Sequence, residues 1–148
     1  MKEISVATIR DIPDLCDLLF LLFSQEDEFI PNKSMQEQGL KIIIENPSVG
    51  HILVVKKENK IVGMITILYT VSTALGGMVG ILEDMIVHPN YRSSGIGNKL
   101  MEYSLEFAKN QNLKRLTLLT DESNIAAHTF YKKHNFSKSS MTPFRKFI

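Results

Sequence analysis

The pattern of apolar and polar positions along the chain predicts an alternation of strands and amphipathic helices. Apolar side chains alternate with polar ones, or form short unbroken runs, in five segments, and both patterns are typical of strands. The predicted strands are residues 2–9, 51–57, 61–71, 81–87 and 115–120. Because only a short polar turn at residues 57–60 separates the second strand from the third, these two strands should pair as a hairpin.

Between these strands, apolar side chains recur every three or four residues, which is the spacing of a helix that buries one face. The first predicted helix follows Asp11, and the others occupy residues 34–46, 98–110 and 124–134. Asp11 should cap the first helix, and Ser34 with Glu37 fits the capping box of the second. The remaining residues, 136–148, should supply a final strand or hairpin.

The order of these elements determines the expected fold class. Three consecutive strands joined by turns should pair antiparallel, and the strand–helix–strand unit after them should add a parallel neighbour. We therefore expect an α/β (α+β) fold with a mixed, mostly antiparallel central sheet and helices on both faces. A chain of 148 residues, of which 44% are hydrophobic, should form one domain over residues 1–148.

Composition excludes several classes of function. The formal net charge of +1 gives no electrostatic reason to bind nucleic acid. The longest apolar run, residues 18–23, is much too short to span a bilayer, and the first residues lack the apolar core of a signal peptide. The single cysteine, Cys16, excludes an internal disulfide. These observations favour a cytoplasmic protein without a membrane or nucleic-acid partner.

The candidate chemistry centres on the loop that follows the fourth predicted strand. Pro89 cannot donate to a sheet ladder, so the strand should end before it. Arg92, Gly95 and Gly97 then fall where the loop becomes a helix. Unpaired N–H groups, flexible glycines and a fixed cation favour the binding of a phosphate there. The chain lacks the Gly-Lys-Ser/Thr ending of a P-loop, and Leu100 stands where the dinucleotide motif G-x-G-x-x-G needs its third glycine.

Two motifs point to one known family. The run Arg92-Ser93-Ser94-Gly95-Ile96-Gly97 resembles the R/Q-x-x-G-x-G/A pyrophosphate loop of the GNAT acyltransferases. The stretch Asn124-x-Ala126-Ala127-x-x-Phe130-Tyr131 resembles the second signature of that family, and the order of predicted elements matches it from end to end. One departure is Asn135, where the family usually has glycine; Asn is the next best residue for a left-handed helix end.

The resemblance implies that the cofactor is acetyl-CoA (coenzyme A). The central strand should pair with the pantetheine arm, the loop should hold the pyrophosphate, and the helix that begins at Asn124 should flank the thioester. The implied cofactor-binding residues are Met85, Ile86, Val87, Arg92, Ser93, Ser94, Gly95, Ile96, Gly97, Asn98, Asn124, Ala127 and Tyr131. The four histidines show no spacing typical of a metal site, so we expect no metal.

The resemblance also implies two catalytic residues, Tyr131 and Glu83. In the family the matching tyrosine points at the thioester sulfur, and a phenol that titrates near ~10 can protonate a departing thiolate. The run Leu82-Glu83-Asp84 resembles the diamine acetyltransferase branch, in which this Glu is the base. Strand alternation should send Glu83 and Asp84 to opposite faces, which leaves Asp84 as a structural partner for backbone or for a basic side chain.

The implied function is an N-acetyltransferase that transfers the acetyl group to a primary amine of a small molecule by direct attack in a ternary complex. The candidate acceptor-binding residues are Phe23, Glu26, Phe29, Tyr69 and Glu83. Residues 72–77, however, lack the acidic and aromatic residues that the diamine branch carries there. A protein or peptide N-acetyltransferase and a non-catalytic CoA-binding regulatory domain stay open as alternatives. Many proteins of this family form dimers, so the resemblance also leaves a homodimer open.

Overall fold

A computed structural model describes residues 3–26, 28 and 30–148. In these residues one sheet is formed by the strands β1 (Glu3–Val6), β2 (Gly50–Lys57), β3 (Lys60–Ser72), β4 (Gly77–Val87) and β5 (Leu116–Leu118). The strands lie in the order β1-β2-β3-β4-β5, and all neighbours are antiparallel except β4 and β5, which are parallel. The predicted hairpin is confirmed, because β2 and β3 join through Glu58 and Asn59. Their φ angles of 51° and 63° are those that a tight hairpin turn requires.

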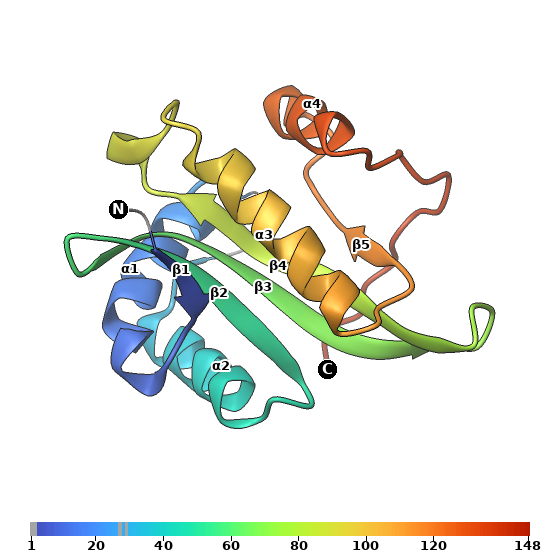
Figure 1. The fold of residues 1–148 in the computed structure, drawn as a ribbon, viewed down its shortest axis with the longest axis horizontal. Coiled ribbons are helices and arrows are strands. Elements are labelled where there is room, and N and C mark those ends of the chain that lie inside the picture. The colour runs from blue at the N-terminus through green and yellow to red at the C-terminus, as the bar shows by residue number, and fades with distance from the viewer. Residues whose placement is uncertain (1–2, 27, 29) are drawn as a thin grey trace.

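Helices cover both faces of the sheet (Figure 1). On one face lie α1 (Ile12–Phe23) and α2 (Lys33–Glu45), and on the other lie α3 (Ile96–Asn110) and α4 (Ile125–Lys133). The sheet has a hydrophobic core on each face, and alternate side chains of β2 point into the two cores. Val54 packs with the core under α1 and α2, and Val55 packs with the core under α3. The predicted fold class, a mixed and mostly antiparallel sheet between helices, is confirmed.

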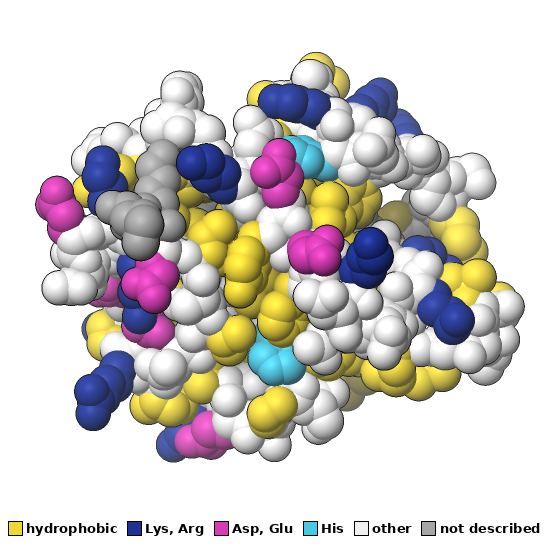
Figure 2. Space-filling view, viewed as in Figure 1, with side chains coloured by type: hydrophobic (Ala, Val, Ile, Leu, Met, Phe, Trp, Pro, Cys, Tyr) yellow, Lys and Arg dark blue, Asp and Glu magenta, His cyan; other side chains and the backbone are white. Residues whose placement is uncertain are grey.

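The surface on the side of α3 is divided between apolar and charged side chains. Figure 2 shows a band of apolar side chains over the strands beside α3, with most of the charged side chains around it. None of the helices in the described part of the chain is long and apolar enough to cross a membrane.

Two predicted helix caps are wrong. The carboxylate of Asp11 makes no cap bond to α1; it accepts the backbone N–H of Thr8 at 2.8 Å and pairs with Lys56 Nζ at 3.0 Å. Asp11 is therefore tied to the turn before α1 and to β2. The helix α2 begins one residue earlier than predicted because Asn32, not Ser34, caps it, with its side-chain oxygen accepting a backbone N–H of the first turn at 3.1 Å.

The predicted final strand or hairpin is also wrong, because residues 136–148, all of which the structure describes, contain no strand. The polar run at 137–140 interrupts any alternation, and Pro143 has no N–H to donate to a ladder. The neighbouring strand β5 is only three residues long, so it offers little backbone for pairing. The apolar side chains of Met141 and Phe144 consequently stay exposed.

Candidate functional site

A bulge interrupts β4 at the predicted catalytic carboxylates. From Glu83 to Ile86, β4 advances three residues while the facing strand β3 advances two. The extra residue is accommodated by Asp84, whose φ of 52° lies in the left-handed region. The bulge changes the face of the sheet to which side chains point. Leu82 packs with the core under α3, whereas Ile86 packs with the core under α1 and α2. In a regular strand, residues four apart share a face, so the alternation assumed for Glu83 and Asp84 does not run through this part of β4.

Beyond the start of this bulge, β4 has a strand neighbour on one edge only. The parallel pairing with β5 joins residues 80–82 to residues 116–118, and β5 then ends. On the opposite edge β3 follows β4 as far as Val87. Met85, Ile86 and Val87, which are predicted to bind the cofactor, therefore lie on a stretch with no strand beside it on the β5 edge, within the described residues. Backbone N–H and C=O groups on such an edge can pair with an extended ligand.

The predicted phosphate loop has the backbone geometry of an anion site. Gly95 begins α3 with a φ of 79°, and Ser93 has a φ of 62°. Within the described residues no side chain caps α3, so the N–H groups of its first turn keep no partner of that kind. A Cβ added at Gly95 would meet nothing within 4 Å, which leaves open space for a ligand at the loop. Arg92 Nε donates to Val87 O at 3.0 Å, so its guanidinium lies against the end of β4.

The helix α4 brings the predicted acid to this region. Asn124 caps α4, because its side-chain oxygen accepts a backbone N–H of the first turn at 3.1 Å. Tyr131 is half-buried and packs edge-to-face against Phe130 and Phe136, with ring centroids 5.5 and 6.0 Å apart. The left-handed conformation predicted for Asn135 is confirmed by its φ of 67°. The chain thus turns sharply after α4 and returns Phe136 to the ring of Tyr131.

Burial and neighbouring charge set the protonation of Asp84. Burial is the larger cause and the negative charges of Glu83 and Glu26 add to it; together they raise the pKa of this half-buried carboxyl to about 7. No ion pair in the described part of the chain includes Asp84, so the expected basic partner does not account for it. Asp84 therefore titrates near neutrality while Glu83, next to it in the chain, is exposed.

Acidic groups from separate segments influence one another here. Burial raises the pKa of Glu26, and so do the negative charges of Asp121 and Glu83, whereas Arg145 lowers it. Burial raises the pKa of Tyr131, and the charge of Glu26 raises it as well. The segment after α1, the bulge of β4, the residues after β5 and α4 therefore meet at one acidic region. Nothing in the apolar and polar pattern indicated Asp121.

Not every predicted acceptor residue lies in this region. Tyr69 pairs with Gly80, which precedes the bulge of β4, and its hydroxyl is 2.5 Å from His51 Nδ1, whose ring packs against Phe107 of α3. Tyr69 therefore lies apart from the acidic groups, because its position in β3 turns its side chain toward α3. Phe23 packs against the core under α1 and α2. Phe29 lies outside the described residues.

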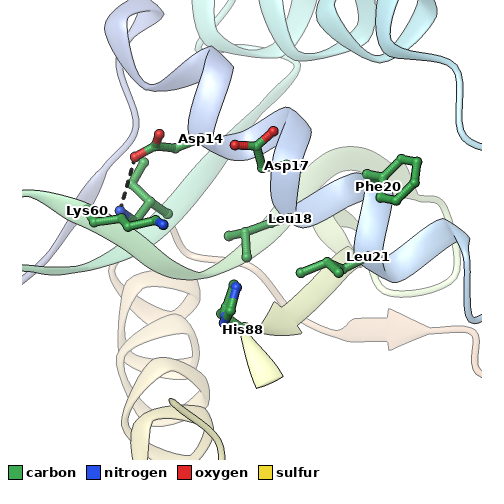
Figure 3. A pocket seen from close by; sticks show the side chains of 8 residues that line it. Asp14, Asp17, Leu18, Phe20, Leu21, Lys60 and His88 are labelled. Atoms are coloured by element: carbon green, nitrogen blue, oxygen red, sulfur yellow. Dashed lines mark hydrogen bonds between the residues drawn. The ribbon is translucent and has the colours of Figure 1, made fainter. Parts of the chain in front are cut away.

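A separate hollow of about 270 Å³ lies between α1, the start of β3 and His88 (Figure 3). Leu18 and Leu21 point from α1 toward His88, while Asp14 turns to the start of β3, where it accepts the N–H of Ile61 at 3.2 Å. None of the predicted site residues lines this hollow. The described residues contain no group of three or more His, Cys, Asp or Glu side chains that could hold a metal ion.

Comparison with known proteins supports one family. The model of the "Acetyltransferase (GNAT) family" matches residues 12–136. The chain is 29% identical over 122 residues to "Uncharacterized N-acetyltransferase YhfO" of Bacillus subtilis (strain 168), over 80% of this chain and 81% of that protein.

Solved structures share the fold. A "possible acetyltransferase" from Clostridium difficile 630 superposes with a TM-score of 0.89 at 20% identity, over 100% of this chain and 98% of that one. A "predicted acetyltransferase with acetyl-CoA" from Clostridium acetobutylicum superposes with a TM-score of 0.81 at 18% identity, over 99% and 96%. At these identities the two structures show that the fold is the same and nothing more.

The raised pKa of Asp84 predicts a pH-dependent cost in stability. The folded pKa of about 7 lies above the ordinary value of 3.8. The folded state therefore binds the proton more tightly, and its stability falls as pH rises between these values. Asp84→Asn removes the charge and keeps a residue that tolerates a positive φ. We expect the free energy of unfolding of this variant to exceed that of the wild type at pH 8 by on the order of a few kcal/mol. The variant should therefore melt at a higher temperature at pH 8 and show little difference at pH 4.

Thermal melts of both proteins from pH 4 to pH 8 measure this effect. Glu102→Gln is the matched control, because Glu102 is an exposed carboxylate on α3, away from the bulge of β4. A stability difference between Asp84→Asn and wild type that does not change with pH would contradict the burial of a titrating carboxylate.

Proposed function

The chain belongs to the acetyltransferase (GNAT) family, and from that premise we propose that it transfers the acetyl group of acetyl-CoA to a primary amine of a small, cationic molecule. The amine would attack the thioester directly, with both substrates bound in one ternary complex. The arrangement that carries this proposal is the edge of β4 that β5 leaves open, where Asp84 lies at the bulge and the charge of Glu26 acts on both Asp84 and Tyr131. An acid for the departing thiolate and a base for the ammonium are the groups that such a transfer uses.

The residues present fit acetyl-CoA along its length. The backbone of Met85, Ile86 and Val87 would hydrogen-bond the pantetheine amides in the manner of an added strand. Arg92 would bind the pyrophosphate with its guanidinium, together with the backbone N–H groups at the start of α3. The open space beside Gly95 is consistent with this role, because a side chain there would occupy the approach to those N–H groups.

Two residues would move the protons. When bound, acetyl-CoA supplies an activated thioester at the open stretch of β4. Tyr131 stays protonated at neutral pH because burial and the charge of Glu26 raise its pKa, so it can give a proton to the sulfur that leaves. Asp84, with a pKa of about 7, is half ionised near neutrality and can take a proton from the ammonium. Glu83 was the base predicted from the resemblance, and we now propose that it assists Asp84 directly or through water.

The charge of the site supports a cationic acceptor. Glu26, Glu83 and Asp84 contribute negative charge, and Asp121 adds to the field at Glu26. A field of one sign attracts an ammonium group and raises its local concentration. Glu26 is half-buried rather than fully exposed, which favours a lined site for a small molecule over a flat surface for a protein.

The test of this function is the release of free thiol from acetyl-CoA in the presence of diamines, amino acids, aminoglycosides and short peptides. We expect turnover with small cationic amines. Acetylation confined to peptides would move the function to a peptide N-acetyltransferase. Tight binding of acetyl-CoA without turnover of any acceptor would leave a CoA-binding regulatory domain.

Tyr131→Phe should lower kcat by at least roughly 100-fold, since general acid catalysis contributes about 10²–10⁴-fold. The affinity for acetyl-CoA should change little, because the ring that packs against Phe130 and Phe136 is kept. Steady-state kinetics with a titration of the cofactor separate the two effects. Tyr103→Phe is the matched control, because Tyr103 lies on α3 and is 40% exposed. Full activity in Tyr131→Phe would remove the phenol from the mechanism.

Arg92→Ala should weaken acetyl-CoA binding by about tenfold or more, which is the effect of losing one charge-assisted hydrogen bond to a phosphate. Isothermal titration at fixed salt measures the dissociation constant. Arg10→Ala serves as the control, because Arg10 is an exposed arginine in the short helix before α1. An unchanged affinity in Arg92→Ala would argue against the phosphate loop.

A further inference from the structure

The C-terminal end of α4 is docked onto the first turn of α3. His134 Nε2 lies 3.0 Å from Asn98 Oδ1, and Lys133 Nζ donates to the same oxygen at 3.5 Å. Phe130 lies under His134, with ring centroids 4.8 Å apart. A Cβ added at Gly97 would lie 3.7 Å from the Phe130 ring, an ordinary van der Waals distance, so the start of α3 lies beside this part of α4. Two side chains that can carry positive charge are thereby held beside the proposed phosphate loop.

The dipole of α4 does not by itself account for this arrangement. The C-terminal end of a helix attracts cations, and Lys132 and Lys133 both lie in the last turn of α4. Of these two lysines, however, only Lys133 donates a hydrogen bond to Asn98. The ammonium and imidazole groups share a single amide oxygen, although an ammonium alone offers three N–H donors. The pair therefore keeps donor capacity that Asn98 does not use.

The unused donors suit a phosphate monoester. Such a group carries between one and two negative charges near neutral pH and presents three strong acceptor oxygens. Coenzyme A carries one, the 3′-phosphate of its adenosine, in addition to the pyrophosphate assigned to Arg92 and the start of α3. Asn98 lies in the first turn of α3, so it holds Lys133 and His134 next to the end of the site where the nucleotide would lie. Side chains held in place before binding lose less conformational entropy when the ligand arrives.

We propose that Lys133 and His134, held by Asn98, bind the 3′-phosphate of coenzyme A and so make the protein select CoA over its 3′-dephospho form. This inference rests on the proposed function, because it assumes that acetyl-CoA binds along β4 and at the start of α3. It adds a second phosphate contact that comes from α4 and lies outside the glycine loop. The contact links recognition of the nucleotide to the helix that carries Tyr131.

The experiment is a pair of titrations at one ionic strength, with CoA and with 3′-dephospho-CoA, on the wild type and on surface variants. The wild type should bind CoA about tenfold more tightly than dephospho-CoA, which is the size of one charge-assisted hydrogen bond. Lys133→Gln should reduce this ratio at least threefold, and the double variant with His134→Gln should bring it close to one. Lys132→Gln, which removes the neighbouring lysine, should leave the ratio unchanged.

The two ligands separate this inference from its rivals. A wild-type ratio near one, or a Lys133→Gln variant that keeps the wild-type ratio, would overturn it. An equal loss of affinity for both ligands would also overturn it, because Lys133 and His134 would then serve the pyrophosphate or the packing of α4. A wild-type protein that binds neither ligand would overturn the proposed function itself, and this inference with it. Thermal melts of each variant confirm that its fold is intact before the ratios are compared.

Discussion

The strand β4 has a partner on both edges only as far as Leu82, and much of the site depends on that limit. Its neighbour β3 continues beside it to Val87, while β5 ends at Leu118. Burying a backbone N–H or C=O group away from water without a hydrogen-bond partner costs free energy. An open edge beside the end of β5 therefore suits an extended chain of amide groups, and the pantetheine arm of acetyl-CoA is such a chain. The resemblance to the family and the strand pairing thus both point to the open edge of β4 as the stretch that would pair with the cofactor.

The bulge adds a second constraint at the point where the strands separate. A residue other than glycine in the left-handed region costs about 1–2 kcal/mol, and Asp84 combines this strain with a partly buried carboxyl whose pKa is raised to about 7. Strain of this kind persists where the surrounding structure holds it, and it is often found at functional sites. Pairing with β3 on both sides of the bulge holds Asp84 in place here. The same residue therefore marks the break in the strand and supplies a group that titrates near neutral pH.

The sequence predicted the parts of this arrangement that depend on local chemistry. Apolar spacing indicated the hairpin, the central strand and the helices, and Asn135 was correctly expected in a left-handed conformation. The bulge could not be predicted in this way, because a period of two shows no register shift until the facing strand is known. The alternation predicted for Glu83 and Asp84 consequently fails at the bulge. The cap predicted at Asp11 was wrong for a similar reason, because the carboxylate of Asp11 pairs with Lys56, which lies in a strand far along the chain. Tyr69 was expected near the acceptor, but its position in β3 directs it toward His51.

Charge repulsion in the acidic region bears directly on how the proposed reaction would proceed. Burial raises the pKa of Asp84, and the charges of Glu83 and Glu26 raise it as well, so in the free protein part of the Asp84 population holds a proton near pH 7. A cationic amine that enters this region offsets the repulsion and favours the ionised form of Asp84. The same carboxylate can then accept the proton that the amine must lose before it attacks. When the proton moves from the ammonium to Asp84, one positive and one negative charge are neutralised together. The net charge of the site therefore stays the same, and the amine becomes neutral. In this way the acceptor would itself prepare the base that activates it.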